Sequence, residues 1–377
     1  MADSTRGGET PPAPQDLQNA GQPHRGRDAT DPTQIPGPGR LDILWRVYRS
    51  IAQDRVLLTA AGVTFYVLLA LVPTLAAIVS IYGLFNDPVS VVEQVDLLVG
   101  IVPPAAIEII RDELTRLTRQ SNDTLGLTLI FSVSLALWSA SASIKALFEA
   151  MNIAYGEEER RSFLHFNGLA LLFTAGGALA AVIALTVIIV LPAAIVLLPG
   201  GAGLEWTLRI VSYGIMLAVL IAALAALYRW GPSRELAKWR WITPGVVLTV
   251  PLFGIVSVAF SWYVTNFTDD SATYGSLGAT IGLMSWLWIT ITLVIIGAEL
   301  NSEIEHQTAR DSTTGPEAPL GERGAYMADT VGRAWPLARP GLEPPPVKGA
   351  PRPMSWAALG FALPAALALH LVRRHRR

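Results

Sequence analysis

The chain has 377 residues, of which 51% are hydrophobic and only 15% are charged. An ordinary globular domain has roughly 25% charged residues, so much of this surface is predicted to face lipid rather than water. Lys and Arg number 28 and Asp and Glu number 30, and the resulting net charge of -2 removes the case for a basic protein that binds nucleic acid. The sequence has no cysteine, which excludes disulfides, thiolate metal sites and cysteine nucleophiles.

The N-terminal part of the chain is polar. Residues 1–40 contain seven Pro and six Gly, a composition that cannot bury enough apolar area to offset the entropy of ordering, so a disordered tail is predicted. Residues 41–55 then place Leu41, Leu44 and Tyr48 at helical spacing. This pattern predicts an amphipathic helix at a membrane interface, with arginines on its other faces that favour an anionic leaflet.

Six segments are long and apolar enough to cross a bilayer, which takes about 20 largely apolar residues. Pro73 and two further prolines lie inside these segments, where neighbouring helices can satisfy the carbonyl groups that proline leaves free. We expect an all-α fold, a polytopic membrane helix bundle with six core transmembrane helices in a membrane domain over 56–305. The predicted spans are Val56–Phe85, Thr124–Ile144, Leu169–Leu198, Ile210–Tyr228, Ile242–Val264 and Leu277–Ala298.

The distribution of Lys and Arg predicts the orientation of this bundle. Basic residues gather before the first span and in the second-to-third and fourth-to-fifth loops, so these parts and the N-terminus are placed in the cytoplasm. The first outer loop disagrees, because it carries three arginines. In the same loop, residues 107–117 have one apolar helical face, which predicts an amphipathic helix on the outer side.

The C-terminal part again changes character. Residues 306–353 are rich in Pro and Gly and are predicted to form a disordered linker. Residues 354–377 are mostly apolar and end in an Arg-rich cluster. A seventh span would carry this cluster outside, against the positive-inside rule, whereas a tail in the membrane plane would keep it inside. The pattern is compatible with both.

Patterns typical of catalysis are missing from the sequence. The five histidines are scattered, and there is no nucleophile elbow or phosphate-binding loop, so we expect no catalytic residue, no metal, no cofactor and no enzymatic activity. Lys145 and Glu149 have the spacing of a helical ion pair, and we expect Lys145 either to extend toward the membrane interface or to pair with Glu149, in both cases for a structural reason. Gly176 and Gly177 each precede an alanine by four residues, a spacing typical of close helix packing.

Short motifs along the membrane domain point to one family. They are Ala60–Tyr66 followed by Leu71-Val72-Pro73, Met151–Tyr155, Pro244-Gly245, Tyr263–Phe267, Thr273–Ala279 and Gly297–Asn301. In order and spacing, over about residues 41–305, they resemble the YihY/BrkB membrane-protein family. The resemblance implies a six-helix, multi-pass bacterial inner-membrane protein, linked to serum resistance and the cell envelope, without a settled molecular activity. Some members carry the label ribonuclease BN, which the lack of a His/Asp cluster argues against.

The leading hypothesis is a transport-type protein that moves or exposes a lipid or another envelope amphiphile, with membrane lipids as its partners. Tyr and Asn side chains are expected to contact headgroups, Pro73 to shape the path, and Glu299 to act as a proton- or cation-sensitive gate. A hydroxyl-rich turn at the start of the last core helix suits an anionic headgroup. The candidate path residues are Tyr66, Pro73, Asn152, Tyr263, Asn266, Tyr274, Gly275 and Glu299.

A scaffold function and an enzymatic function are the alternatives to transport. A scaffold or assembly factor for envelope proteins would use the amphipathic helix at 107–117 and the two tails to recruit partners. An intramembrane or RNA-processing enzyme is disfavoured, because no catalytic constellation supports it. No pattern in the sequence sets the oligomeric state.

Overall fold

The computed structural model describes residues 13–82, 111, 115, 125–197, 201–267 and 276–335. Within these ranges the regular secondary structure is helical, and the one pairing of extended backbone is an isolated antiparallel bridge between Ala237 and Thr313. The predicted all-α class is confirmed. The long helices are α3 (Val56–Tyr82), α6 (Leu125–Tyr155), α7 (Phe163–Leu197), α8 (Gly201–Trp230), α9 (Trp239–Phe267) and α11 (Ser276–Glu305).

Several of these helices can cross a membrane by length and composition. In the described ranges, four pass alone, and α2 (Gly37–Gln53) with the first part of α3 makes a fifth when the two, bent by 59°, are taken as one span. A polytopic helical protein is thus supported, whereas the six-span count stays a prediction, and 354–377 lies outside the described residues. The four spans are Phe163–Ala184, Trp206–Trp230, Trp239–Tyr263 and Thr280–Glu305.

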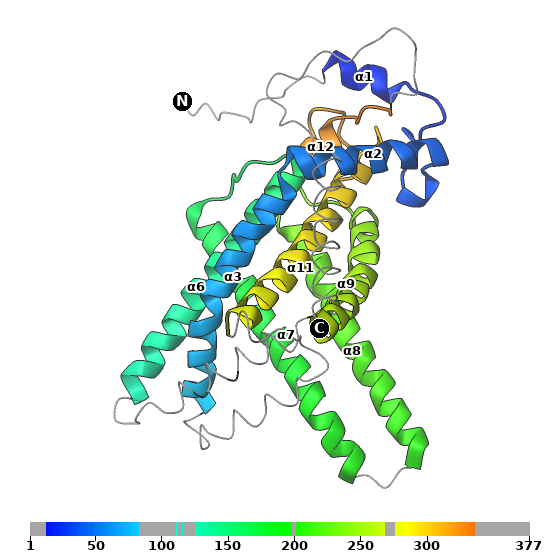
Figure 1. Cartoon of the computed structure of the whole chain (residues 1–377). Coiled ribbons are helices and arrows are strands. Elements are labelled where there is room, and N and C mark those ends of the chain that lie inside the picture. Colours follow the sequence, from blue (N-terminus) through cyan, green and yellow to red (C-terminus); the bar gives the residue numbers. More distant parts are fainter. Residues whose placement is uncertain are drawn as a thin grey trace, which may run out of the picture.

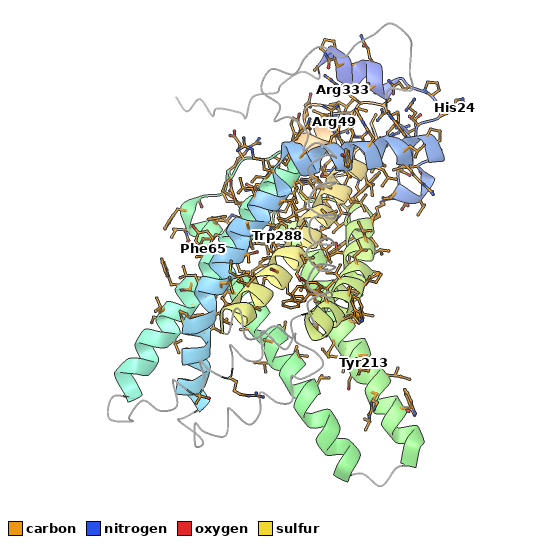
Figure 2. The ribbon with its side chains drawn as sticks, viewed as in Figure 1. His24, Arg49, Phe65, Tyr213, Trp288 and Arg333 are labelled. Atoms are coloured by element: carbon orange, nitrogen blue, oxygen red, sulfur yellow. The ribbon has the colours of Figure 1, made fainter. Side chains whose placement is uncertain are left out.

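The long helices form a ring in which each contacts the next. The order is α3, α6, α7, α8, α9 and α11, and α11 closes the ring by packing on α3 (Figure 1). Where α11 meets α3, the Trp288 indole Nε1 donates a hydrogen bond of 2.9 Å to the Leu57 carbonyl (Figure 2). The α7–α8 side is thin, because only 6% of the α7 span and 17% of the α8 span are buried.

Two glycines let α9 and α11 cross closely. A Cβ on Gly245 would collide with the Gly297 carbonyl and the Asn301 amide, and a Cβ on Gly297 would collide with Tyr228 and Thr249. The Gly245 N–H donates to Asn301 Oδ1 at 2.6 Å, which fixes the register of the two helices. Both glycines belong to the sequence motifs described above, so in these two motifs the glycine is needed for close packing of α9 against α11.

One end of the ring, which we call the α2 end, carries α2 and the short helices α1 (Pro14–Ala20) and α12 (Tyr326–Asp329) (Figure 1). Asp42 and Arg46 on α2 are buried against the protein, whereas Leu41 and Tyr48 on its other face are exposed. The predicted helix over 41–55 therefore exists, beginning at Gly37, and its apolar face points away from the bundle.

The predicted disorder of 1–40 and 306–353 is wrong for the parts that the structure describes, residues 13–40 and 306–335. Arg27 is only 2% exposed and donates to the carbonyls of Gln307 at 3.1 Å and Gly332 at 2.7 Å. Arg323 is likewise buried and donates to three backbone carbonyls. Composition failed here because these segments combine hydrogen bonds to remote backbone with the burial of a few apolar side chains, among them Ile35, Met327 and Val331.

Two buried ion pairs fasten the α2 end to the last turn of α11. The Arg46 guanidinium of α2 pairs with Glu303 and also donates to the Glu303 carbonyl at 2.9 Å. The Arg234 guanidinium, from the α8–α9 loop, holds both carboxylate oxygens of Glu305 at 2.6 Å, with side chains 2% and 1% exposed. Such pairs are stable only when their hydrogen bonds are complete, as they are here.

Replacing Arg234 with Met should destabilise the protein strongly. The substitution leaves the Glu305 carboxylate buried and unpaired, which costs about 3–5 kcal/mol. Arg160→Met is the matched control, because this loop arginine is 70% exposed and lies 3.8 Å from Glu157. Thermal unfolding in detergent should show a large loss for Arg234→Met and almost none for Arg160→Met. Equal losses would contradict the role given to the buried pair.

Candidate functional site

The ring helices border a partly open apolar pocket of about 640 Å³, which we call the central pocket. Five of the six ring helices line it, and α9 does not. The only polar groups of its lining side chains are the Ser143 hydroxyl and the Trp230 indole N–H. Its walls include Val63, Val67, Ile144, Leu147, Leu169, Phe173, Leu220, Leu224, Leu227, Ile291 and Val294.

Two glycines of α7 keep the central pocket open. A Cβ on Gly176 or Gly177 would meet no atom within 4 Å, although both residues line the pocket. The expectation that these glycines bring helix backbones together is therefore wrong. Their missing side chains leave space instead, because the helix next to them stands farther away than close packing requires.

The α6 wall of the pocket is held tightly to α3. The Ser143 hydroxyl donates to the Tyr66 carbonyl at 2.8 Å and to the Ser139 carbonyl at 3.2 Å, so this polar group is satisfied at the edge of an apolar space. On the α7 side, Phe148 packs edge-to-face on Phe173 with ring centroids 5.0 Å apart. Small residues such as Ser143 thus let α6 pack closely against α3.

A second hollow of about 490 Å³ follows the junction of α3 and α6, and we call it the seam groove. The predicted path residue Tyr66 lines it and is 41% exposed. Lys145 and Glu149 line it as well, and within the described residues no ion pair joins them, so pairing, one of the two structural roles expected for Lys145, is not observed. The remaining lining residues are Thr59, Gly62, Val63, Ala142, Ala146 and Phe166.

Glu299 is the most unusual of the predicted residues. It is 1% exposed on α11, and neither carboxylate oxygen has a hydrogen-bond partner within the described part of the chain. Asp54 and Glu303 are the charged groups that act on it, and both are acidic. A buried carboxylate without a partner is costly, so this position is a candidate for a group that gains and loses a proton.

Asn152 serves the loops at the α2 end rather than either hollow. Its amide donates to Glu159 Oε2 at 3.1 Å, and its Oδ1 accepts from the Ser233 N–H at 2.7 Å. Arg161 also binds both oxygens of Glu159. Burial raises the pKa of Glu159, but the hydrogen bonds from Arg161 and Asn152 outweigh burial and lower it to about 2.

The other predicted path residues lie far from these hollows or outside the description. Pro73 lies within α3, which continues to Tyr82. Tyr263 is exposed near the end of α9, its ring centroid 6.5 Å from that of Phe260. Asn266 is in the last turn of α9, where only the backbone is described. Tyr274 and Gly275, and the predicted helix at 107–117, lie outside the described residues.

Sequence reasoning missed the buried ion pairs of Arg46 and Arg234. Arg46 and Arg234 were read only as markers of orientation, because nothing local in the sequence shows that each meets an acidic residue on α11. In the described ranges, no three His, Asp or Glu side chains are grouped so that they could hold a metal ion. The chemistry available in the hollows is therefore that of apolar contact, hydroxyl groups and single charges.

A ring of apolar helices around an apolar pocket defines the class, a polytopic helical membrane protein. The profile of the family described as virulence factor BrkB matches residues 47–321, more than half of the chain. The chain belongs to this family, as the sequence motifs indicated.

Several curated relatives are similar over most of the membrane domain. YfkH of Bacillus subtilis (strain 168), whose name calls it ribonuclease-like, is 30% identical over 259 residues, which cover 64% of this chain and 88% of YfkH. A UPF0761 membrane protein of Neisseria meningitidis serogroup B is 30% identical over 70% of this chain and 63% of its own length. A UPF0761 membrane protein of Alkalilimnicola ehrlichii is 27% identical over 70% of this chain and 58% of its own length. No solved structure matches the chain.

Replacing Glu159 with Gln should reduce the sensitivity of the fold to acid. Because the folded-state pKa is about 2 and the ordinary value is 4.5, the stabilisation by Glu159 is complete above about pH 4.5 and is lost as the pH falls toward 2. Melting temperatures in detergent between neutral pH and pH 3 should fall less steeply for Glu159→Gln than for the wild type. Its exposed neighbour supplies the control, Glu158→Gln, whose slope should match the wild type.

Proposed function

We propose that this protein binds a lipid or another envelope amphiphile inside its helix ring and moves or exposes it across the bacterial inner membrane. The central pocket carries this proposal. Its volume of about 640 Å³ is in the range of ligand sites, roughly 300–1,000 Å³. Its apolar lining offers acyl chains a surface like that of the bilayer core, so transfer from lipid into the pocket costs little.

The proposed orientation places the α2 end in the cytoplasm. Arginines gather at this end, and the positive-inside rule favours it there. The exposed Leu41, Leu44 and Tyr48 of α2 supply an apolar surface that can lie on the inner leaflet, as an interfacial helix does. In this arrangement Tyr66 borders the path near the inner leaflet, Pro73 lies deeper along α3, and Tyr263 stands at the opposite end of α9.

The alternative, a scaffold for envelope proteins, draws less support. It would recruit partners through the helix at 107–117, which lies outside the described residues, and through the two tails. In the described parts of the tails, residues 13–40 and 306–335, many hydrogen bonds join the two segments to each other. Arg27 and Gln307 are examples, since Arg27 binds the Gln307 carbonyl and Gln307 donates to the Arg25 carbonyl at 2.8 Å. Segments bound in this way offer a partner few free groups.

Filling the central pocket should slow lipid transfer. Gly176→Phe places a ring in the open space of the pocket. Because Phe has a higher helix propensity than Gly, the substitution gains about 0.4 kcal/mol of helix propensity rather than losing any. The measurement is the rate at which labelled phospholipid crosses the bilayer of liposomes that contain the full-length protein. We expect a clear rate above empty liposomes for the wild type and a rate near that of empty liposomes for Gly176→Phe.

Gly168→Phe is the matched control on the same helix. A Cβ on Gly168 also meets nothing within 4 Å, but this residue lines neither hollow. The control should transfer lipid at the wild-type rate. The proposed function would be contradicted if folded wild-type protein transferred lipid no faster than empty liposomes. If both variants slowed transfer equally, the central pocket would not be the part of the protein that carries the lipid.

Glu299 is the proposed proton-sensitive gate of this path. It is buried without a hydrogen-bond partner in the described ranges, with Asp54 and Glu303 as acidic neighbours, and the positive charge of Arg46 is already engaged by Glu303. Glu299→Gln fixes the neutral form, so lipid transfer should lose its dependence on pH in the same liposome assay. Transfer by Glu299→Gln that follows the wild-type rate at every pH would exclude this role.

A further inference from the structure

The seam groove contains one positive and one negative side chain that do not neutralise each other. Lys145 and Glu149 are one helical turn apart on α6 and both line the groove, yet no ion pair or hydrogen bond joins either of them to another described residue. Glu149 is exposed and Lys145 is half-buried, so both charges are accessible to a ligand or a headgroup that enters the groove.

Both walls of the groove are built to leave it open. Thr59, Gly62 and Tyr66 lie on one face of α3 at helical spacing, and Lys145 and Glu149 lie on one face of α6. A Cβ on Gly62 would meet nothing within 4 Å, so the floor of the groove is free of side-chain atoms at that point. The hydroxyl groups of Thr59 and Tyr66 add hydrogen-bonding capacity to the two charges.

The groove begins near the α2 end of the membrane helices and runs inward along α3 from Thr59 to Tyr66. Phe166 borders it from the first turn of α7, whose apolar span begins at Phe163, and Thr59 lies in the first turn of α3, which begins at Val56. These first turns mark the edge of the apolar zone on the α2 side. α6 runs toward that side and ends at Tyr155, so Glu149 is nearer the water and Lys145 one turn deeper.

We propose that the seam groove binds the headgroup of an aminophospholipid, with the phosphate on Lys145 and Tyr66 and the primary ammonium on Glu149. The proposal rests on the proposed function and names its lipid class. In such a headgroup the phosphate lies nearer the acyl chains and the ammonium nearer the water, which is the order of Lys145 and Glu149 along α6. One helical turn, about 5.4 Å, suits the short link between the two charged groups.

The alternative headgroups fit less well. A purely anionic headgroup leaves Glu149 facing like charge, which is unfavourable. A trimethylated amine keeps its positive charge but has no N–H to donate to the carboxylate, so the charge-assisted hydrogen bond is lost. The groove therefore recognises the two ends of the headgroup separately. Lys145 binds the phosphate of any phospholipid, and Glu149 selects headgroups with a primary amine.

Lipid binding to the purified full-length protein tests this assignment. Native mass spectrometry in detergent compares phosphatidylethanolamine, phosphatidylcholine and phosphatidylglycerol with identical chains. We expect phosphatidylethanolamine to bind about tenfold more tightly than the other two. Lys145→Gln should weaken the binding of all three lipids, whereas Lys145→Arg should bind them like the wild type. Glu149→Gln should abolish only the preference for phosphatidylethanolamine. Gly62→Leu, which fills the groove without a clash, should weaken all three.

Arg240→Gln is the control for the loss of a cation, because Arg240 is exposed on α9 and lines neither hollow. It should bind like the wild type. Equal affinity for the three lipids, or unchanged binding by Lys145→Gln and Glu149→Gln, would overturn the assignment. Competition by inorganic phosphate or free phosphoethanolamine as strong as that by the lipid would also overturn it, in favour of a soluble ligand.

The failure of this inference is distinguishable from the failure of the proposed function. Lipid transfer by the wild type without headgroup preference in binding overturns the aminophospholipid site and leaves the proposed function in place. The opposite result is a headgroup preference that depends on Lys145 and Glu149 in a protein that transfers no lipid. It would support the binding site but contradict lipid transport, and the bound lipid could then not be called a transport substrate.

Discussion

The last turn of α11 is the constraint on which the rest of the structure depends. Glu303 and Glu305 each bind an arginine from a different part of the chain, Arg46 of α2 and Arg234 of the α8–α9 loop. Removing either partner would leave a charge buried without compensation, so each pair permits only one placement of the element it binds. The α2 end of the ring is fixed in this way, whereas the α7–α8 side relies on lipid-like contacts that impose no single arrangement.

This polar end also explains why the segments that flank the membrane domain are ordered. Asp42 of α2 binds Arg25 and accepts from the Trp335 N–H at 2.7 Å, so one buried carboxylate joins both flanks. Arg27 does the same through the Gln307 and Gly332 carbonyls. These contacts join residues 13–40 and 306–335 to each other and to α2, and the two flanking segments therefore complete the fold at this end.

The sequence allowed the helices to be predicted but not their polar partners. Hydrophobic runs of about 20 residues depend only on local composition, so α7 was predicted from Leu169 and begins one to two turns earlier at Phe163. The pairing of Arg27 with Gln307 joins residues 280 positions apart, and no periodicity encodes such a contact. The prediction of close helix packing at Gly176 is wrong for another reason. The same spacing of small residues occurs where helices pack closely and where they leave open space.

The contrast between the two sides of the ring indicates where the proposed amphiphile would enter. Opening the ring between α3 and α11 would break the Trp288 hydrogen bond to Leu57 and disturb the ion pairs beyond it. Displacing α7 costs less, because Gly176 and Gly177 contribute no side-chain contacts across the central pocket and the helix is little buried. The first turn of α7 also borders the seam groove through Phe166. The helix that is easiest to move thus lies against both the groove that holds charges and the pocket that holds none.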